Sequence, residues 1–450
     1  MKSLPLVSGR ALHDTLAWRP GGAVSVARYC ADALALAAAL PAARFIVNLC
    51  EDRYHYAVLL AACALSGRVS LQPSSQSEAT LRRLAQDYAD AVAVTDAPTP
   101  LPPELPAHPL PDLGTLAGAP CRAMPQIAPD ATVAILFTSG STGAPQPHAK
   151  TWGKMVKSGR AEAVALGLLD APLTLVGTVP AQHSYGFEST FLLALHGGCS
   201  FWSGKPFYPQ DLVDALAALA QPAMVVTTPY HLAHVLASDI ALPPVARWLS
   251  ATAPLDAALA QRVEAASGAP VFEIYGSTES SQLATRRTTA GAEWQPMPGV
   301  RLEQDGDTTW ACGGHVEGRI ALADLIELHA DGRFTLQGRH ADMVNLAGKR
   351  TSLAYLNHQL RSLDGVQDAA FFLPEEDDVH RVGRLVAFAV APGRERAALL
   401  AALRTRVDPI FMPRPLVLVD AIARNATGKI ARSTLEDLYA RHASHASHAS

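Results

Sequence analysis

The chain has 450 residues, of which 49% are apolar and 17% are charged, and its formal net charge at pH 7 is −4. This length predicts two or three domains, and the composition excludes a chain that is disordered throughout. The small net charge and the lack of a basic block argue against nucleic acid as a partner.

The N-terminus, MKSLPLVSGR, lacks the apolar core of a signal peptide. The most apolar stretches, Ala31–Leu40 and Ala57–Leu65, are too short to cross a bilayer, so no membrane association is expected. The six cysteines are scattered without the spacing of a zinc site or a disulfide framework, which favours a reducing compartment. We therefore expect a cytoplasmic protein.

Strand-like and helix-like patterns alternate along most of the chain. Apolar runs of strand length are Phe45–Leu49, Ala91–Thr95, Thr132–Phe137, Leu173–Val179, Met224–Thr227 and Val271–Ile274. Helical spacing occurs in Tyr54–Leu65, Glu78–Tyr88 and Asp211–Ala220. This alternation predicts the α/β fold class, with a large N-terminal domain of doubly wound, mostly parallel sheets.

The proline-rich segment Ala97–Gly114 interrupts this pattern. Its prolines exclude a central strand or helix and predict an extended surface connector. A polyproline ligand for a partner domain is the alternative.

A second, smaller domain is predicted after residue 338, where the sequence becomes polar and rich in turn residues. Its α and β candidates are Leu353–Leu363, Ala369–Leu373, Leu385–Val390 and Ala397–Val407. We expect an N-terminal domain over 1–338, a small α+β domain over 339–441 and a disordered tail over 442–450. The tail repeats His-Ala-Ser three times, and weak metal binding by its histidines is the alternative.

Residues 138–145 read TSGSTGAP directly after an apolar strand candidate. Glycines let a backbone approach phosphate closely, and hydroxyl and N–H groups donate to phosphate oxygens. A Walker A loop would place a lysine directly after its second glycine, but here Ala144 follows Gly143. The stretch by itself is therefore either a different phosphate loop or a Ser/Thr-rich turn, and a phosphotransferase of the P-loop type is disfavoured.

Three further motifs follow in order: YGSTES at 275–280, LQGRHADMVNLAGKR at 336–350 and RNATGKIAR at 424–432. Together with the first, they resemble the core motifs of the acyl-adenylate-forming (ANL) superfamily, which includes acyl- and aryl-CoA synthetases, nonribosomal adenylation domains and luciferases. The resemblance implies that a carboxylate attacks the α-phosphorus of ATP, that pyrophosphate leaves, and that a thiol then accepts the acyl group. Because two anions are pushed together, the site needs opposite charges and aligned donors.

The resemblance also implies residue roles on the nucleotide side. The loop Thr138, Ser139, Gly140, Ser141, Thr142 and Gly143 would bind the phosphates, and Tyr275 and Gly276 would hold the adenine end. Thr278 would contact the α-phosphate, and Glu279 would hold Mg²⁺. Asp324 and Arg339 would bind the ribose or phosphate, although the family's TGD is LAD in this chain.

Lys429 is the predicted catalytic lysine, since an ammonium on a long stem can reach the carboxylate and the α-phosphate together. In the family this lysine belongs to a small mobile domain that swings about a hinge. The usual acidic pivot position is Ala341 here, with Asp342 one place later, so the identity of the hinge residue stays open.

Residues that match the family's acyl pocket are His183, Tyr185, Tyr230 and Ala253. One departure concerns the phosphate loop: most relatives place a lysine after its proline, where this chain has Gln146. Our hypothesis is that Lys150 reaches back toward the β- or γ-phosphate instead.

The compact core resembles stand-alone ligases of bacterial aryl polyene and xanthomonadin-type pathways. Such enzymes load an aryl acid, such as a hydroxybenzoate or hydroxycinnamate, onto the phosphopantetheine thiol of an acyl carrier protein. An acyl-CoA synthetase for a short or medium fatty acid or an aryl acid is the first alternative, since coenzyme A carries the same thiol. A non-catalytic nucleotide- or acyl-binding regulator is the second, but it would not need Lys429, Glu279 and Asp324.

Overall fold

The computed structural model describes residues 3–73, 75–116, 118–139, 145–306, 308–339, 343–346, 349–374, 384–425 and 428–447. The chain divides into two compact units. The first unit comprises Met1–Glu303, Ala311–Ile320 and Ala330–Arg333, and the second comprises Gln304–Trp310, Ala321–His329 and Phe334–Ser450.

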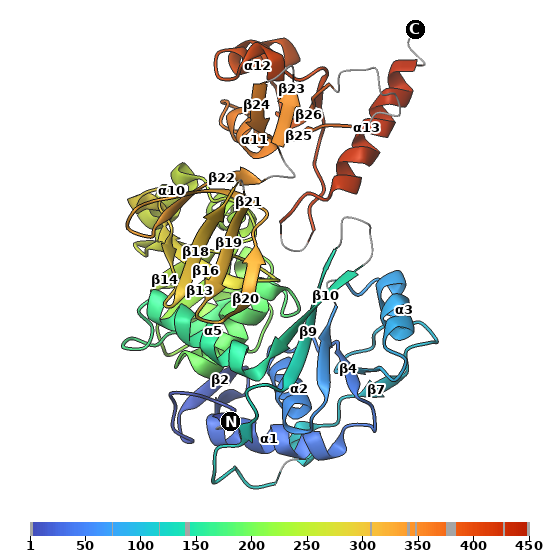
Figure 1. The fold of residues 1–450 in the computed structure, drawn as a ribbon, viewed down its shortest axis with the longest axis vertical. Helices are drawn as coiled ribbons and strands as arrows, with labels where there is room; N and C mark the ends of the chain where they lie inside the picture. Colours follow the sequence, from blue (N-terminus) through green and yellow to red (C-terminus); the bar gives the residue numbers. More distant parts are fainter. Residues whose placement is uncertain are drawn as a thin grey trace. The chain divides into compact units, whose positions relative to one another are not determined.

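A six-stranded sheet forms one part of the first unit, with the strand order β10-β9-β5-β4-β6-β7. These strands are β10 (Pro145–Thr151), β9 (Thr132–Ser139), β5 (Val69–Gln72), β4 (Phe45–Asn48), β6 (Val92–Thr95) and β7 (Ala107–Pro109). All neighbours are parallel except β9 and β10, which form a hairpin. Around this sheet lie α1 (Val26–Ala39), α2 (Arg53–Leu65) and α3 (Glu78–Asp87) (Figure 1).

The second sheet of the first unit has nine strands in the order β17-β16-β15-β14-β13-β11-β12-β2-β3. They are β17 (Gln295–Pro296), β16 (Ser281–Arg287), β15 (Val271–Ser277), β14 (Arg247–Ser250), β13 (Ala223–Thr227), β11 (Thr174–Gly177), β12 (Ser200–Trp202), β2 (Thr15–Arg19) and β3 (Gly22–Ser25). The six strands from β15 to β2 are parallel. Because neighbouring parallel strands end at the same edge, the loops that follow them gather there.

Helices alternate with these strands, as buried parallel strands require. They are α5 (Trp152–Ala165), α6 (Ser184–Gly186), a π-helix (Phe187–Leu192), α7 (Leu193–His196), α8 (Pro209–Ala217), α9 (Pro229–Ala237) and α10 (Ala257–Ser267). One core cluster packs Leu212 of α8 and Val263 of α10 on Val225 and Trp248 of the sheet. The predicted α/β class with mostly parallel sheets is confirmed.

Smaller elements complete the first part of the chain. They are β1 (Leu4–Pro5) paired with β8 (Gln126–Ile127), α4 (Leu113–Leu116), a 3₁₀-helix (Thr288–Ala290), and the sheet of β18 (Val300–Asp305), β19 (Thr308–Gly313) and β20 (Val316–Ala321). The proline-rich segment contributes β7, which lies at a sheet edge where prolines are tolerated, and the start of α4.

The second unit contains two hairpins and a three-stranded sheet. The hairpins are β21 (Asp324–Leu328) with β22 (Phe334–Arg339) and β23 (Met343–Leu346) with β24 (Lys349–Ser352), and the sheet is β25 (Asp368–Phe372), β26 (Val386–Val390) and β27 (Leu416–Leu418). Its helices are α11 (Leu353–Arg361), α12 (Arg396–Arg404), a 3₁₀-helix (Pro409–Phe411) and α13 (Arg432–Ser447). Leu356, Phe371 and Leu403 share its main core.

Helix α13 extends to Ser447, into the segment for which the sequence predicts a disordered tail. The alanines of the His-Ala-Ser repeats favour a helix, which the polar character of the repeats does not reveal.

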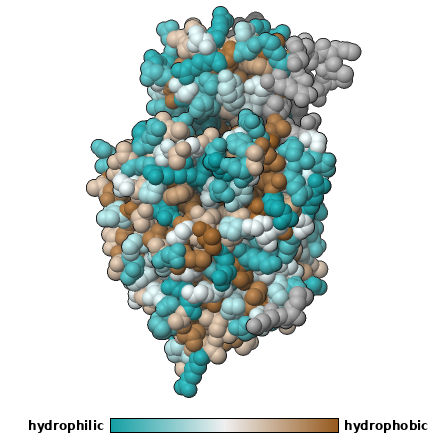
Figure 2. All heavy atoms as spheres, turned by 60° about the vertical axis from the view of Figure 1, so that its left-hand side comes forward, coloured by the Kyte–Doolittle hydropathy of each residue, from teal (hydrophilic) through white to brown (hydrophobic). Residues whose placement is uncertain are grey.

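Apolar and polar residues are interspersed on the face drawn in Figure 2. Exposed apolar side chains such as Leu34, Phe207 and Tyr208 are ordinary on a folded protein. Within the described ranges, none of the helices has both the length and the apolar character needed to span a membrane.

Candidate active site

Four residues predicted for the acyl and adenine sites follow neighbouring strands at one edge of the nine-stranded sheet. His183 follows β11, Tyr230 follows β13 and Ala253 follows β14, while Tyr275 lies toward the end of β15. The topology brings these positions together, since all four strands are parallel. This edge of an α/β sheet is where ligands usually bind.

The predicted pocket residues differ in exposure. The His183 side chain caps α6 by accepting a hydrogen bond from the Tyr185 N–H at 3.3 Å. Tyr185 is buried, and its hydroxyl donates to the Leu249 carbonyl at 2.8 Å, which ties the turn to the end of β14. Tyr230 is 37% exposed, with its ring centroid 4.1 Å from that of His234.

The YGSTES motif forms the end of β15 and a turn into β16, and we call residues 277–281 the STES turn. A β-bulge separates Tyr275 from Gly276. A side chain at Gly276 would bring its Cβ within 2.3 Å of the Ser281 carbonyl oxygen, so glycine is required there for space. The hydroxyls of Ser277 and Ser280, 3.0 Å apart, close the turn.

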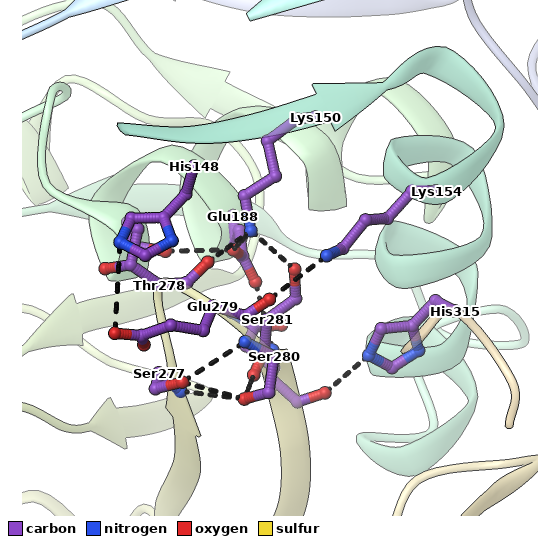
Figure 3. Close-up of polar contacts among 12 residues, drawn as sticks. His148, Lys150, Lys154, Glu188, Ser277, Thr278, Glu279, Ser280, Ser281 and His315 are labelled. Atoms are coloured by element: carbon purple, nitrogen blue, oxygen red, sulfur yellow. Dashed lines mark hydrogen bonds and ion pairs between the residues drawn. The ribbon is translucent and has the colours of Figure 1, made fainter. Parts of the chain in front are cut away.

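Two lysines from one region of the chain donate to the STES turn (Figure 3). The Lys150 ammonium donates to the Thr278 carbonyl at 2.6 Å and to the Ser281 hydroxyl at 3.0 Å. The Lys154 ammonium donates to the next carbonyl, that of Glu279, at 3.2 Å. The hypothesis that Lys150 reaches back to a phosphate therefore differs from the structure, which directs this ammonium inward to the turn.

A buried acid lies beneath Lys150. The Glu188 carboxylate is 3.8 Å from the Lys150 ammonium, and both side chains are 2% exposed. Burial lowers the pKa of Lys150 to about 8, and the charge of Glu188 opposes this shift. Glu188 also accepts from the Ser184 hydroxyl at 2.9 Å and from the Gln282 N–H at 3.1 Å.

Glu279 has the properties of a magnesium ligand. Burial by itself would raise its pKa, but hydrogen bonds from Ser277 and its own N–H, with the charges of His148 and Lys150, hold that pKa below the ordinary value. The His148 Nε2 lies 3.9 Å from the Glu279 carboxylate and 3.0 Å from the Thr138 hydroxyl. An ionised, partly exposed carboxylate fits Mg²⁺, which proteins commonly hold through one or two carboxylates together with substrate phosphates.

Within the described ranges, no cluster of three or more His, Cys, Asp or Glu side chains could hold a metal by itself.

Tyr275 is the first of a series of residues joined by aromatic, cation–π and ion-pair contacts. The Trp294 ring centroid is 5.7 Å from that of Tyr275, and the Arg286 guanidinium lies 4.5 Å from the Trp294 centroid. The buried Glu273 carboxylate accepts from Arg286 at 2.6 Å and from the Leu255 N–H at 3.0 Å. These contacts link the predicted adenine residue to the loop that contains Ala253.

The second unit contains the predicted ribose and catalytic residues. Asp324 and Arg339 are direct partners in the β21–β22 pair. Lys429 is exposed, and its N–H donates to the Asn425 side-chain oxygen at 2.9 Å. Arg424 donates to the carbonyl of Gly428, the residue before Lys429, at 2.6 Å.

Some predicted residues lie outside the described part of the chain. These are Gly140, Ser141, Thr142 and Gly143 of the phosphate loop and Ala341 and Asp342 of the hinge. The backbones of Ser139 and Arg339 are described, but their side chains are not.

This region also contains residues that no sequence pattern singles out, namely Lys154, Glu188, Gln282 and Trp294. Glu188 lies shortly after the predicted pocket residues His183 and Tyr185, and this was the signal available in the sequence. The lysines' contacts join residues more than a hundred positions apart, which no local pattern reveals.

Known structures establish the fold. The o-succinylbenzoate CoA synthetase MenE from Bacillus subtilis, solved with its acyl-adenylate, matches with a TM-score of 0.81 at 20% identity over 97% of this chain and 99% of that chain. MatB from Rhodopseudomonas palustris, solved with ATP, matches with a TM-score of 0.78 at 20% identity, covering 95% and 96% of the two chains. The fold is therefore that of the adenylate-forming enzymes.

The model of the AMP-binding enzyme family matches residues 22–322, so the chain belongs to this family. The 4-coumarate–CoA ligase of Rhodobacter capsulatus is 30% identical over 282 residues, covering 61% of this chain and 67% of that protein. The fatty acid–[acyl-carrier-protein] ligase MmaC of Mycobacterium marinum is 25% identical over 483 aligned positions, covering 92% and 91%. The chain is an enzyme whose relatives are named as ligases.

Proposed function

We propose that this protein activates an aryl acid, such as a hydroxybenzoate or hydroxycinnamate, as its acyl-adenylate and transfers it to the phosphopantetheine thiol of an acyl carrier protein. The observation that carries adenylation is the STES turn, which places the partly exposed Glu279 carboxylate beside Thr278 after the end of β15, within a chain of the AMP-binding family. The aryl acid is supported by the 4-coumarate–CoA ligase, the relative with 30% identity. The carrier protein is supported by MmaC, which matches over 92% of this chain.

The proposed reaction brings the substrate carboxylate and the phosphates of ATP together, so the charges in the site determine the roles of its residues. The substrate carboxylate attacks the α-phosphorus of ATP, the bond to the β-phosphate oxygen breaks, and pyrophosphate leaves. The Thr278 hydroxyl would donate to the α-phosphate, and the Lys429 ammonium would approach the carboxylate and the same phosphate as charge builds. Magnesium, when bound by Glu279 and phosphate oxygens, would offset the repulsion between the two anions.

An acyl-CoA synthetase is the second candidate, because the relative from R. capsulatus is named as a CoA ligase. The first half-reaction is the same, and only the acceptor differs.

Acid-dependent ATP–pyrophosphate exchange tests adenylation. We expect exchange with at least one acid from a panel of hydroxybenzoates, hydroxycinnamates and fatty acids. Lys429→Ala should lower the rate by roughly a hundredfold or more, the cost of removing a donor to transition-state charge. Arg404→Ala is the control, since Arg404 is an exposed cation in the last turn of α12 of the same unit and lies outside the four motifs.

If no acid supports exchange, adenylation is refuted, and if Lys429→Ala exchanges as fast as wild type, the assignment of the lysine is refuted. Mass measurement after incubation with holo carrier protein or with coenzyme A then identifies the acceptor. Loading of coenzyme A alone would replace the first candidate by the second.

A further inference from the structure

Lys150 and Lys154 are two buried cations for which the proposed chemistry assigns no role. Lys150 lies near the end of β10 and Lys154 in the first turn of α5, with 2% and 6% of their surfaces exposed. Thr151 caps α5 between them by accepting from the Lys154 N–H at 3.2 Å. The cap thus fixes the angle at which the helix leaves the strand and keeps both lysines beside the STES turn.

Each ammonium donates to one of two successive carbonyls, those of Thr278 and Glu279. Figure 3 shows both side chains approaching the turn from β10 and α5. Since a peptide unit is planar, fixing its carbonyl also fixes its plane. The two contacts therefore set the backbone from which the Thr278 hydroxyl and the Glu279 carboxylate project.

Further hydrogen bonds hold the end of the turn and the start of β16. Ser281 accepts from Lys150, and the N–H of Gln282 donates to Glu188 at 3.1 Å. His315 donates from Nε2 to the Gln282 carbonyl at 2.6 Å, because a carbonyl can only accept. Glu188 compensates the charge of Lys150, which a buried ammonium requires.

We propose that Lys150 and Lys154 are positioning residues that hold the STES turn in the geometry for binding magnesium and ATP. This inference rests on the proposed function, in which Thr278 and Glu279 bind the nucleotide phosphates and their metal. The lysines act through the backbone of the turn and do not touch the reacting atoms.

Titration calorimetry with MgATP, together with ATP–pyrophosphate exchange, tests this role. Lys154→Met removes one donor and keeps most of the apolar stem. We expect MgATP binding about tenfold or more weaker, since a hydrogen bond from a charged group is worth this factor or more. The melting temperature should change little. Lys157→Met is the matched control, because Lys157 is exposed on the same helix, and it should bind as wild type.

Lys150→Met leaves Glu188 buried without its cation and can fail to fold. The double variant Lys150→Met/Glu188→Gln removes both charges and keeps the shapes. We expect it to fold, to bind MgATP at least tenfold more weakly and to require more magnesium for half-maximal binding. A role limited to stability would lower the melting temperature while the folded fraction bound MgATP normally.

The measurements distinguish failure of the proposed function from failure of the positioning role. Wild type that binds MgATP but supports no exchange refutes the proposed function, and weakened MgATP binding by the variants still supports the positioning role. Folded Lys154→Met and double variants with wild-type MgATP affinity and exchange rate would overturn that role.

Discussion

At the scale of single residues, Glu162 is a buried acid on α5 for which the proposed mechanism has no use. Its side chain is 0% exposed. Burial raises the pKa of Glu162 to about 8, and the nearby charge of Glu188 adds to the rise. This carboxyl therefore keeps its proton at neutral pH in the folded protein, whereas in the unfolded chain it ionises near pH 4.5.

This difference in proton binding determines how the free energy of unfolding changes with pH. Between about pH 5 and pH 8 the folded state binds a proton at Glu162 that the unfolded state has lost, so stability falls as pH rises through this window. Glu162→Gln should match wild type near pH 5 and be more stable at pH 8. At pH 8 the free energy of unfolding should be higher in the variant than in wild type. The difference should be about 1.4 kcal/mol for each tenfold difference in the proton affinity of Glu162 between the folded and unfolded states.

Urea unfolding of both proteins at pH 5, 6, 7 and 8 measures this difference. Glu51→Gln, at an exposed position, serves as the control that should show no such trend. A constant difference between wild type and Glu162→Gln across the series would contradict the raised pKa.

At the scale of elements, a partly buried ion pair shapes the loop that carries Lys429. Arg424 donates to the Asp368 carboxylate at 2.6, 2.8 and 3.0 Å, and Asp368 lies at the start of β25. The same guanidinium donates to the Gly428 carbonyl at 2.6 Å. The planar, forked guanidinium reaches both partners from separate nitrogens, whereas a lysine ammonium would have to lie within reach of both from a single point.

Arg424→Lys should therefore impair adenylation more than folding. The charge is kept, and Asp368 retains a second partner in Arg361 at 3.3 Å, so the melting temperature should change by only a few degrees. The exchange rate should fall about tenfold, because the backbone beside Lys429 loses its anchor. Arg404→Lys, at an exposed arginine in the last turn of α12, is the control. An unchanged exchange rate would show that the loop holds its geometry without Arg424.

Most elements of the core are predictable because their burial leaves a mark on the sequence. Strands β4, β6, β9, β11, β13 and β15 are covered on both faces, so each appears as an apolar run close to its observed bounds. Strand β10 was missed because its sequence, PQPHAKT, is polar and contains two prolines. Prolines are tolerated in β10 because it is an edge strand of the sheet. The buried Lys150 of this strand donates to the Thr278 carbonyl, which lies far away in the sequence.

Part of the candidate site can also be predicted from the sequence, where its residues lie in one local motif. Tyr275, Thr278 and Glu279 lie in one motif, so a local pattern finds them together. Lys154, Glu188 and Trp294 act through contacts between distant segments, and only the fold reveals those. The same limit explains why Glu162 looks in the sequence like any other helical glutamate.

At the scale of the whole molecule, the residues proposed for catalysis are divided between the two units. The first unit contains the STES turn with Thr278 and Glu279, and the second contains Asp324, Arg339 and Lys429. In the superfamily that the motifs resemble, the small domain swings after adenylation and presents another face for thioester formation. If this chain behaves in the same way, the two half-reactions depend differently on Lys429.

We therefore expect Lys429→Ala to separate the two steps. Adenylation needs an ammonium where the carboxylate meets the α-phosphate, so exchange should fall by roughly a hundredfold. Transfer from a synthetic acyl-adenylate starts after that step. Its rate should stay within a few-fold of wild type, because a swing like that of the superfamily would take the lysine away from the reacting atoms. Mass spectrometry of the acylated carrier protein or coenzyme A follows this transfer, with Arg404→Ala measured alongside as the control. Equal losses in both half-reactions would mean that Lys429 serves thioester formation too.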